Sequence, residues 1–319
     1  MNRSADGNAA FAEPREAVDW RLFLGLSRTP HGILDVATPA MAALLCLGHF
    51  PSVSVIVVGL VTAFAGYTAV YALNDLVDLR VDKERLALRD EAKGHFDVDG
   101  LMVPHPLAQG LLPYRSALLW FSSWAAVALA GAWWLNPICA GLFILSALFE
   151  TLYCKLLRIT YLKILPSAIV KATGGLAGAY AVEPNPSPAF LVMLFVWLAA
   201  WELGGQNIAN DIIDMDDDAR VEARTTATVK GLPEAVFMLI VAASMAAIGG
   251  FVVYWFAGKG VGSLYPIGAV ILGWKLLLDP ARAVYQRPVP ETAAALFNKA
   301  SHVPLAFLLL TAVSIFLPI

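Results

Sequence analysis

Asn74–Asp82, with the sequence NDLVDLRVD, is repeated later in the chain as Asn210–Asp218, with the sequence NDIIDMDDD. Both copies place an asparagine and three aspartates at the same four offsets. Residues four apart lie on one face of a helix, so the first, fifth and ninth positions of each copy form a polar stripe. Each copy follows a long apolar run, residues 52–73 before the first and residues 189–209 before the second. The repeat therefore predicts two helices that each present acidic groups where a membrane-length segment ends.

The oxygen atoms of these two stripes indicate a metal site. Carboxylate and amide oxygens suit Mg²⁺, which commonly shares its coordination shell with substrate phosphates. A single Asp-x-x-x-Asp pattern usually marks a solvated helix face, but two nine-residue copies in equivalent places favour a shared function. The second residues of the copies, Asp75 and Asp211, lie about 100° from the stripes and could either orient the ligands or face water. The predicted Mg²⁺ ligands are Asn74, Asp78, Asp82, Asn210, Asp214 and Asp218.

The composition excludes an ordinary soluble domain. Of the 319 residues, 59% are hydrophobic and 15% are charged, and the mean hydropathy is +0.67. Soluble domains have about 25% charged and about 45–50% apolar residues. The three cysteines, Cys46, Cys139 and Cys154, show no metal-binding spacing. We therefore expect an all-α, multi-pass membrane protein with a short N-terminal cytoplasmic lead-in, residues 1–24, and one transmembrane domain, residues 25–319.

The apolar runs predict nine transmembrane helices around a central cavity. Their approximate bounds are 32–50, 52–73, 116–135, 137–153, 165–182, 189–209, 235–256, 263–278 and 303–317. Residues 291–300 could form an interfacial helix or extend the ninth span. Asp35 lies within the first predicted span and Lys171 within the fifth, and ionisable groups in lipid usually face a cavity.

The distribution of basic residues predicts the orientation in the membrane. With nine spans, both motif loops and the loops around residues 155–163 and 282–287 lie on one side. The loops of the opposite side contain a single basic residue, Lys259. Cytoplasmic loops carry an excess of Lys and Arg, so we expect both motifs to face the cytoplasm, with the protein in a bacterial inner membrane.

Basic residues on the side of the motifs are candidates to hold the phosphates. Lys155 and Lys163 lie in the loop after the fourth predicted span, and Arg224 follows the second motif. Arg28 precedes the first span, and Lys171 is expected to point into the cavity. Contact with lipid headgroups explains the location of the loop residues equally well.

The double motif, together with Arg224-Thr225 and the nine predicted spans, resembles the UbiA superfamily of intramembrane prenyltransferases. The resemblance covers nearly the whole transmembrane region. It implies an all-helical fold of nine transmembrane helices around a central cavity, in which the motifs bind Mg²⁺ and a prenyl diphosphate. Family members ionise this donor to an allylic carbocation, which an acceptor then attacks. Tyr153 and Lys155 resemble the Tyr/Lys region of the family, whose basic groups contact the diphosphate.

The chain also departs from the family pattern. His105-Pro106-Leu107-Ala108-Gln109-Gly110 resembles an Arg-Pro-Leu-x-x-Gly segment, with histidine where arginine is common. Glu222 stands where glycine is usual after the second motif. Members that act on 4-hydroxybenzoate tend to carry an arginine about seven residues before the first motif, where this chain has Tyr67. That difference weakens the case for a carboxylated aromatic acceptor. A quinone precursor, a chlorin alcohol, a sugar phosphate or no separate acceptor stay open.

The motifs and the resemblance together give the expected site. The predicted catalytic residues are Asp78, Asp82, Asp214, Asp218 and Lys155. The predicted substrate-binding residues are Arg28, Tyr67, Tyr153, Lys163, Lys171 and Arg224. The expected partners are a prenyl diphosphate, a lipophilic acceptor and membrane lipid, without nucleic acid, and the sequence indicates no particular protein partner.

Three functions compete at this point. The first is Mg²⁺-dependent prenyl transfer to an acceptor, such as an aromatic compound or a quinone precursor. The second is an intramembrane terpene cyclase on the same scaffold, in which the prenyl chain attacks itself. The third is an ion-coupled transporter, but transporters place charged groups near the bilayer midplane, whereas these motifs lie at helix ends.

Overall fold

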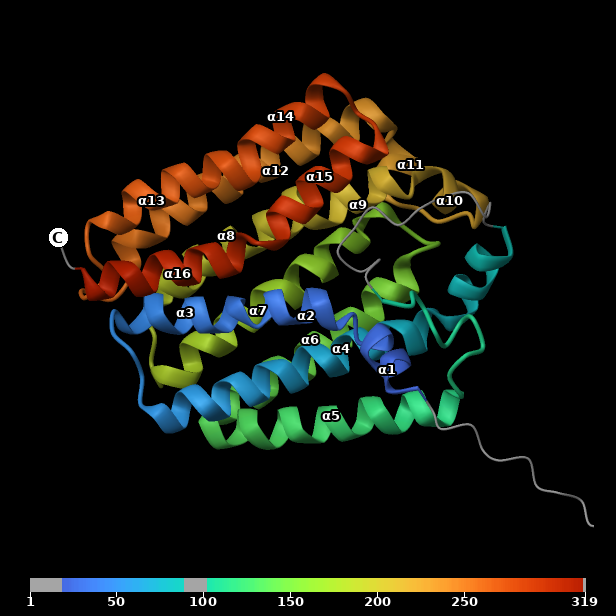
Figure 1. Ribbon diagram of the computed structural model, residues 1–319. Helices are drawn as coiled ribbons and strands as arrows, with labels where there is room; N and C mark the ends of the chain where they lie inside the picture. Colours follow the sequence, from blue (N-terminus) through green and yellow to red (C-terminus); the bar gives the residue numbers. More distant parts are fainter. Residues whose placement is uncertain (1–18, 89–101, 318–319) are drawn as a thin grey trace, which may run out of the picture.

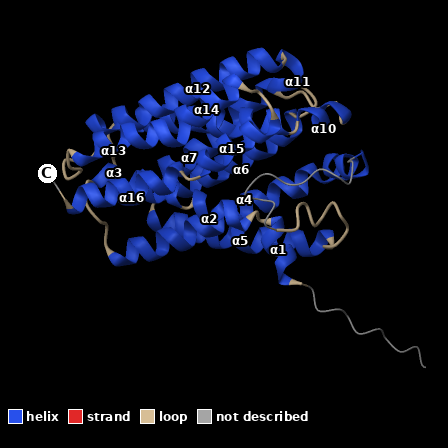
Figure 2. Cartoon of the chain, turned by 45° about the horizontal axis from the view of Figure 1, so that its top comes forward, coloured by secondary structure: helices blue, strands red, loops and turns tan. Residues whose placement is uncertain are grey.

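The computed structural model describes residues 19–88 and 102–317, and over these ranges the chain is helical with no strand (Figure 1, Figure 2). The predicted all-α class is confirmed. Most of the lead-in and part of the first polar loop lie outside the described residues.

The N-terminal half comprises α1 (Trp20–Leu26), α2 (Thr29–Asp35), α3 (Ala37–Leu47), α4 (Val53–Leu88), α5 (Tyr114–Leu135), α6 (Pro137–Leu156), η2 (Tyr161–Lys163) and α7 (Ile164–Val182). The C-terminal half comprises α8 (Pro188–Trp201), η3 (Glu202–Asn207), α9 (Ile208–Ile213), α10 (Met215–Arg220), α11 (Thr226–Lys230), α12 (Leu232–Val252), η4 (Val253–Phe256), α13 (Leu264–Gly273), η5 (Trp274–Leu278), α14 (Asp279–Gln286), α15 (Pro290–Ser301) and α16 (Val303–Phe316).

Within the described residues, seven helical segments are long and apolar enough to cross a membrane. They are Thr29–Leu47, Val53–Leu88, Tyr114–Leu135, Pro137–Leu156, Pro188–Ile213, Leu232–Phe256 and Pro290–Phe316. The other two predicted spans are helical as well, in α7 and in α13 with η5, but they are not among the seven. The count of nine therefore stays a prediction. Residues 291–300 lie in α15, which belongs to the same candidate segment as α16, and this favours an extension of the last span over a separate interfacial helix.

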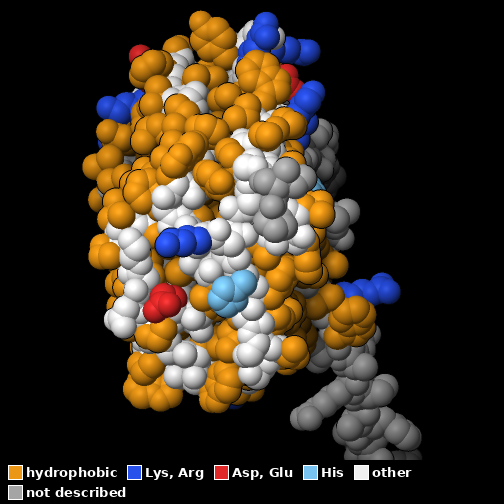
Figure 3. Space-filling view, turned by 90° about the vertical axis from the view of Figure 1, so that its left-hand side faces the viewer, with side chains coloured by type: hydrophobic (Ala, Val, Ile, Leu, Met, Phe, Trp, Pro, Cys, Tyr) orange, Lys and Arg blue, Asp and Glu red, His pale blue; other side chains and the backbone are white. Residues whose placement is uncertain are grey.

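The long helices lie side by side, and the two acidic motifs emerge at the same end of the bundle (Figure 1). α4 is 36 residues long and carries the first motif in its C-terminal half, beyond the apolar part of the helix. The second motif occupies α9 and α10, next to α11. The opposite end is mostly hydrophobic or uncharged and shows only a few charged side chains (Figure 3). The fold thus gathers the acidic residues at one end of an apolar bundle.

Small residues allow α7 to lie close to its neighbours. A Cβ atom added to Gly178 would lie 2.1 Å from the carbonyl oxygen of Pro39 in α3, and one added to Gly175 would lie 2.2 Å from the Leu198 side chain in α8. Small residues let neighbouring helices approach closely, and these two contacts are of that kind. α7 is thereby held against both α3 and α8.

The helix that carries the second motif changes its winding just before the motif. Glu202–Asn207 forms a π-helical segment between α8 and α9. Within it, a Cβ atom on Gly204 would meet the backbone nitrogen of Ala243 in α12 at 2.2 Å. Short π-helical segments are frequent at functional sites. Here the segment brings Glu202 and Asn207, both buried, to the wall of the acidic cavity described below.

Substitution of Gly178 tests the close packing of α7 on α3. We expect Gly178→Ala to lower the free energy of unfolding by about 1–3 kcal/mol, because the new methyl group must displace the backbone at Pro39. Gly141→Ala in α6 is the matched control, since nothing lies within 4 Å of its added Cβ atom. Thermal unfolding in detergent measures both variants. Equal stability of the two variants would contradict the packing argument.

Candidate active site

All six predicted metal ligands line one polar cavity of ≈ 290 Å³ at the motif end of the bundle. The first stripe enters it from α4, and the second enters it from α9, α10 and the turn between them. Acidic groups from segments more than 120 residues apart in the sequence thus surround one space. A space lined by carboxylate and amide oxygens is chemically suited to a hard divalent cation.

The second motif is not one continuous helix. α9 ends at Ile213, Asp214 has φ −97° and ψ 9°, and α10 begins at Met215. The Asn210 side chain donates a hydrogen bond to Asp214 Oδ2 at 3.3 Å across this break. Asp217, which was not among the predicted ligands, also lines the cavity. It comes seven residues after Asn210, which is about two helical turns, and this spacing was the available sequence signal.

The second residue of each motif orients other groups and does not face water. Asp75 and Asp211 are both 3% exposed. Asp75 Oδ1 lies 3.8 Å from the Arg28 guanidinium, and Asp211 accepts a hydrogen bond from the backbone nitrogen of Thr226 at 2.8 Å. Lys163 Nζ also lies 3.5 Å from Asp211 Oδ1. The orienting alternative is therefore the one that the geometry supports.

His105 holds the described part of the first polar loop against α4. Its Nδ1 lies 3.3 Å from Asp75 Oδ1 and 3.2 Å from Asp82 Oδ2. Burial lowers the pKa of His105, but hydrogen bonding and attraction to the two carboxylates raise it to about 10. The backbone at His105 has φ 44°, which is unusual for a residue other than glycine. A positively charged imidazole thus occupies the place where the family commonly has arginine.

Basic residues also line the cavity, beside the acidic groups. Arg28 donates a hydrogen bond to Asn74 Oδ1 at 3.2 Å, and Arg85 lies 2.5 Å from Asp218 Oδ1. Lys163 is almost fully buried and donates to the Tyr153 hydroxyl at 3.2 Å. Burial raises the pKa of Asp218 to about 7, although Arg85 acts in the opposite direction. Arg85 was missed from the sequence, and its position one turn beyond the first motif on the same helix was the available signal.

The structure does not bring Lys155 and Arg224 into the cavity. Both are exposed, and neither is among the residues that line the polar space. Tyr153, Cys154 and Leu157 of the same segment line the cavity, so Lys155 projects from another side of α6. The backbone nitrogen of Arg224 donates to Leu157 at 2.7 Å, while its side chain lies outside. The predicted contact of Lys155 and Arg224 with the diphosphate therefore has no support from the lining of the cavity.

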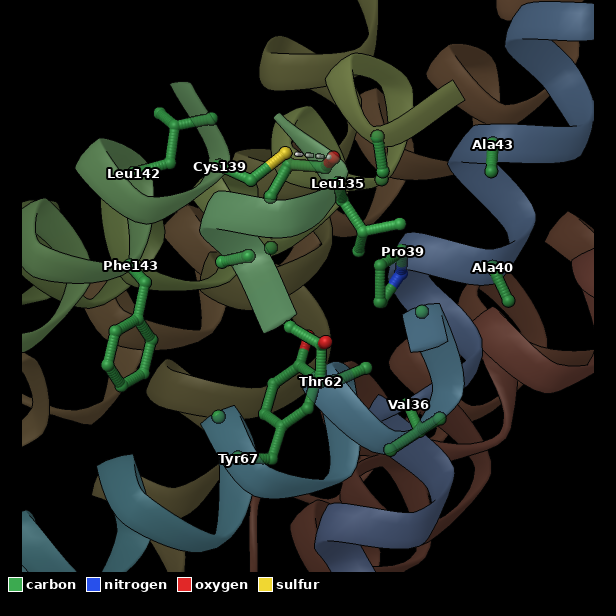
Figure 4. A pocket seen from close by; sticks show the side chains of 18 of the residues that line it. Val36, Pro39, Ala40, Ala43, Thr62, Tyr67, Leu135, Cys139, Leu142 and Phe143 are labelled. Atoms are coloured by element: carbon green, nitrogen blue, oxygen red, sulfur yellow. Dashed lines mark hydrogen bonds between the residues drawn. The ribbon is translucent and has the colours of Figure 1, made fainter. Parts of the chain in front are cut away.

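Figure 4 shows side chains of a second, apolar cavity of ≈ 370 Å³. This cavity shares lining residues with the polar one. It lies among α3, α4, α5, α6 and α7, with side chains such as Leu142 and Phe143 along its wall. Tyr67 lines this apolar cavity and not the polar one, whereas Lys171 lines both. Cavities of a few hundred cubic ångströms are typical of small-molecule sites. Together the two cavities suit a ligand with a charged end and a hydrophobic end.

The fold and the site define an integral membrane protein with a binding site for an amphiphilic, anionic ligand. The model of the UbiA prenyltransferase family matches residues 36–308, and the chain belongs to this family. The resemblance inferred from the double motif is therefore confirmed.

The individual relatives share only 17–24% of their residues with this chain. The chain is 24% identical over 262 residues to a 4-hydroxybenzoate octaprenyltransferase of Shewanella frigidimarina, covering 80% of this chain and 85% of the relative. Among solved structures, a UbiA homologue from Aeropyrum pernix K1 matches with a TM-score of 0.69 and 18% identity, covering 89% of this chain and 97% of the other. A UbiA homologue from Archaeoglobus fulgidus bound to GPP and Mg²⁺ matches with a TM-score of 0.67 and 17% identity, covering 92% and 99%. These structures establish that the chain has the UbiA fold.

Replacement of Arg85 tests the contact between the two motif segments. We expect Arg85→Gln to lower kcat/KM for the donor about 10-fold or more, because Asp218 loses its buried counter-ion. Arg80→Gln is the matched control on the same helix, where the Arg80 side chain is 88% exposed. Steady-state kinetics with a prenyl diphosphate compares the two. A similar small loss in both variants would show that Arg85 has no special role.

Proposed function

We propose that the protein transfers a prenyl group from a prenyl diphosphate to an aromatic acceptor, such as a quinone precursor, within the membrane. The observation that carries this proposal is the meeting of an acid- and base-lined cavity with an apolar one. Prenyl diphosphates have a charged end and a hydrocarbon end, and the two cavities match these two ends. Family membership and the relatives that act on 4-hydroxybenzoate support the same reaction class.

The residues around the polar cavity fit Mg²⁺ as the metal. The stripes of α4 and of α9–α10 offer carboxylate and amide oxygens only, which are hard ligands. When bound, Mg²⁺ would neutralise the negative charge of the diphosphate, which is the group that leaves. Asp78, Asp82, Asp214 and Asp218 are the residues of this chain that would hold the ion. The Archaeoglobus fulgidus homologue that binds GPP together with Mg²⁺ supports this assignment.

Arg28, Arg85 and Lys163 are the basic groups proposed to contact the diphosphate. Each lines the polar cavity, and each is already within reach of an acidic or amide group of a motif. Their positive charges lie between the motifs and therefore beside the expected phosphates. Such preorganised charges are most effective in a site that excludes water. The prenyl tail then extends into the apolar cavity among α3 to α7.

We further propose that the motif end of the bundle faces the cytoplasm, in a bacterial inner membrane. The charge asymmetry of the loops supports this orientation. In a cysteine-free background, we expect Gln109→Cys and Glu222→Cys to react with a membrane-impermeant reagent from the cytoplasmic side. Asn185→Cys, in the loop before α8, should react only from the opposite side. Labelling of Asn185→Cys and Glu222→Cys from the same side would contradict the topology.

Substitution of one carboxylate in each motif tests the proposed function. We expect Asp78→Asn and Asp214→Asn each to lower turnover by about 100-fold or more, because each removes a negatively charged ligand from the metal site. Asp216→Asn is the matched control, since Asp216 is exposed and does not line the cavity. Mass spectrometry of lipids from cells that express each variant gives the readout.

The products distinguish the competing reactions. A prenylated aromatic compound that disappears in both variants supports the proposal, and a cyclised hydrocarbon would indicate the terpene cyclase. Full activity of Asp78→Asn, or activity that survives removal of divalent cations by EDTA, would overturn the metal-held diphosphate.

A further inference from the structure

Four residues line both the polar and the apolar cavity and so mark the junction between them. They are Tyr71, Glu150, Ser167 and Lys171. Tyr71 is the only aromatic residue of the four, and it lies three residues before Asn74 on α4. Residues three apart are neighbours on a helix surface, so the ring lies beside the first group of the motif. The Tyr71 side chain is half-buried, and it lines both spaces.

The contacts of Tyr71 fix the position of its ring. The hydroxyl donates a hydrogen bond to Asp35 Oδ2 at 2.5 Å and accepts one from Lys171 Nζ at 3.1 Å. Lys171 Nζ also lies 2.5 Å from Asp35 Oδ2, so these three residues form one buried, closely paired group. Asp35 belongs to α2 and Lys171 to α7. The ring is therefore held from two other helices.

Two positively charged side chains, Arg28 and Lys171, lie near the Tyr71 ring. The centre of the Arg28 guanidinium is 5.8 Å from the ring centroid, and Lys171 Nζ is 5.6 Å from it. The face of an aromatic ring attracts cations within about 6 Å, and the attraction grows when water is excluded. The ammonium of Lys171 is paired with Asp35, which offsets its positive charge beside the ring.

We propose that Tyr71 is a catalytic residue whose ring stabilises positive charge on the C1 carbon of the prenyl group. The inference rests on the proposed function, because it needs a prenyl diphosphate with its charged end in the polar cavity and its tail in the apolar one. In that pose the bond between C1 and the diphosphate oxygen lies at the junction, beside Tyr71. When this bond breaks, both electrons leave with the diphosphate and C1 becomes electron-deficient. The acceptor then supplies the electron pair for the new bond at C1 and gives up a proton to the released diphosphate.

Asp35 acts through Tyr71 as a positioning residue. A hydrogen bond from a phenol to a carboxylate increases the electron density of the ring, which strengthens its attraction for a cation. The same contact keeps the ring from turning away from the junction. This role accounts for an ionisable residue in the first transmembrane segment, where such a group needs a functional reason.

Positional isotope exchange tests the inference, because it reports breakage of the bond at C1 without requiring an acceptor. The donor is geranyl diphosphate labelled with ¹⁸O in the bridging oxygen, incubated with Mg²⁺ and the purified protein. Movement of the label to non-bridging positions measures reversible ionisation. We expect Tyr71→Leu to slow the exchange about 10- to 30-fold, while the KM for the donor changes little. Tyr71→Phe should slow it less than about 5-fold, because the ring is retained and only the hydroxyl is lost.

Phe64→Leu is the matched control. Phe64 is an aromatic residue two turns earlier on α4 that packs on Trp124 and lines neither cavity. Its variant should keep the exchange rate of the parent protein. A series of ring-fluorinated phenylalanines at position 71 preserves packing while lowering the electron density of the ring. We expect the exchange rate to fall with each added fluorine.

The outcomes separate this inference from the proposed function. If the parent protein binds the donor but shows no exchange and no transfer, ionisation itself fails and the proposed function fails with it. If the parent protein exchanges the label, equal rates for Tyr71→Leu and Tyr71→Phe would show that the aromatic ring does not contribute, and this result would overturn the inference. A rate that is independent of fluorination would likewise overturn the role of the ring.

Discussion

The structure depends on the pairing of buried charges inside an apolar bundle. An ionised side chain without a partner is costly in such surroundings, yet the described residues place many aspartates there. Asp35 pairs with Lys171, Asp211 with Lys163 and Asp218 with Arg85. His105 forms ion pairs with both Asp75 and Asp82. Because the partners come from different helices and loops, each pair also fixes where two segments meet. The same contacts that make the acidic cavity possible therefore hold its walls in place.

The sequence was sufficient to predict the parts of the site that follow from regular helices. The stripes of Asn74–Asp82 and Asn210–Asp218 were identified from spacing alone, and all six predicted ligands line one cavity. Comparison of the two motifs was not sufficient to identify Asp217, which lines the cavity about two helical turns after Asn210. Nor did it distinguish Lys155 from Lys163, since both follow the same span. The orientation of α6 places the Lys155 side chain outside the polar cavity, and the turn after α6 places the Lys163 side chain in its wall.

The meeting of the two cavities could not be read from the sequence at all. Composition predicted apolar helices and a polar end, but the junction depends on how α4 and α7 cross. A glycine of α7 allows the close approach to α4, because a Cβ atom on Gly174 would lie 2.7 Å from the Tyr67 hydroxyl oxygen. Tyr71 had no pattern to mark it, because an aromatic residue in a transmembrane segment is most often a packing residue. Its importance comes from Asp35 and Lys171, which reach it from helices far away in the sequence.

The asparagine that opens the first motif has a physical explanation in its neighbours. The Asn74 side chain accepts a hydrogen bond from Arg28 and donates one to Glu150 at 2.7 Å, a residue of the cavity junction. An amide carries both a donor and an acceptor, whereas an ionised carboxylate has acceptors only. Aspartate at this position would bring two carboxylates together in a buried site and raise the cost of placing Glu150 there. Asparagine thus places an amide oxygen near Arg28 without adding a charge, and its nitrogen donates to the buried glutamate at the edge of the apolar cavity.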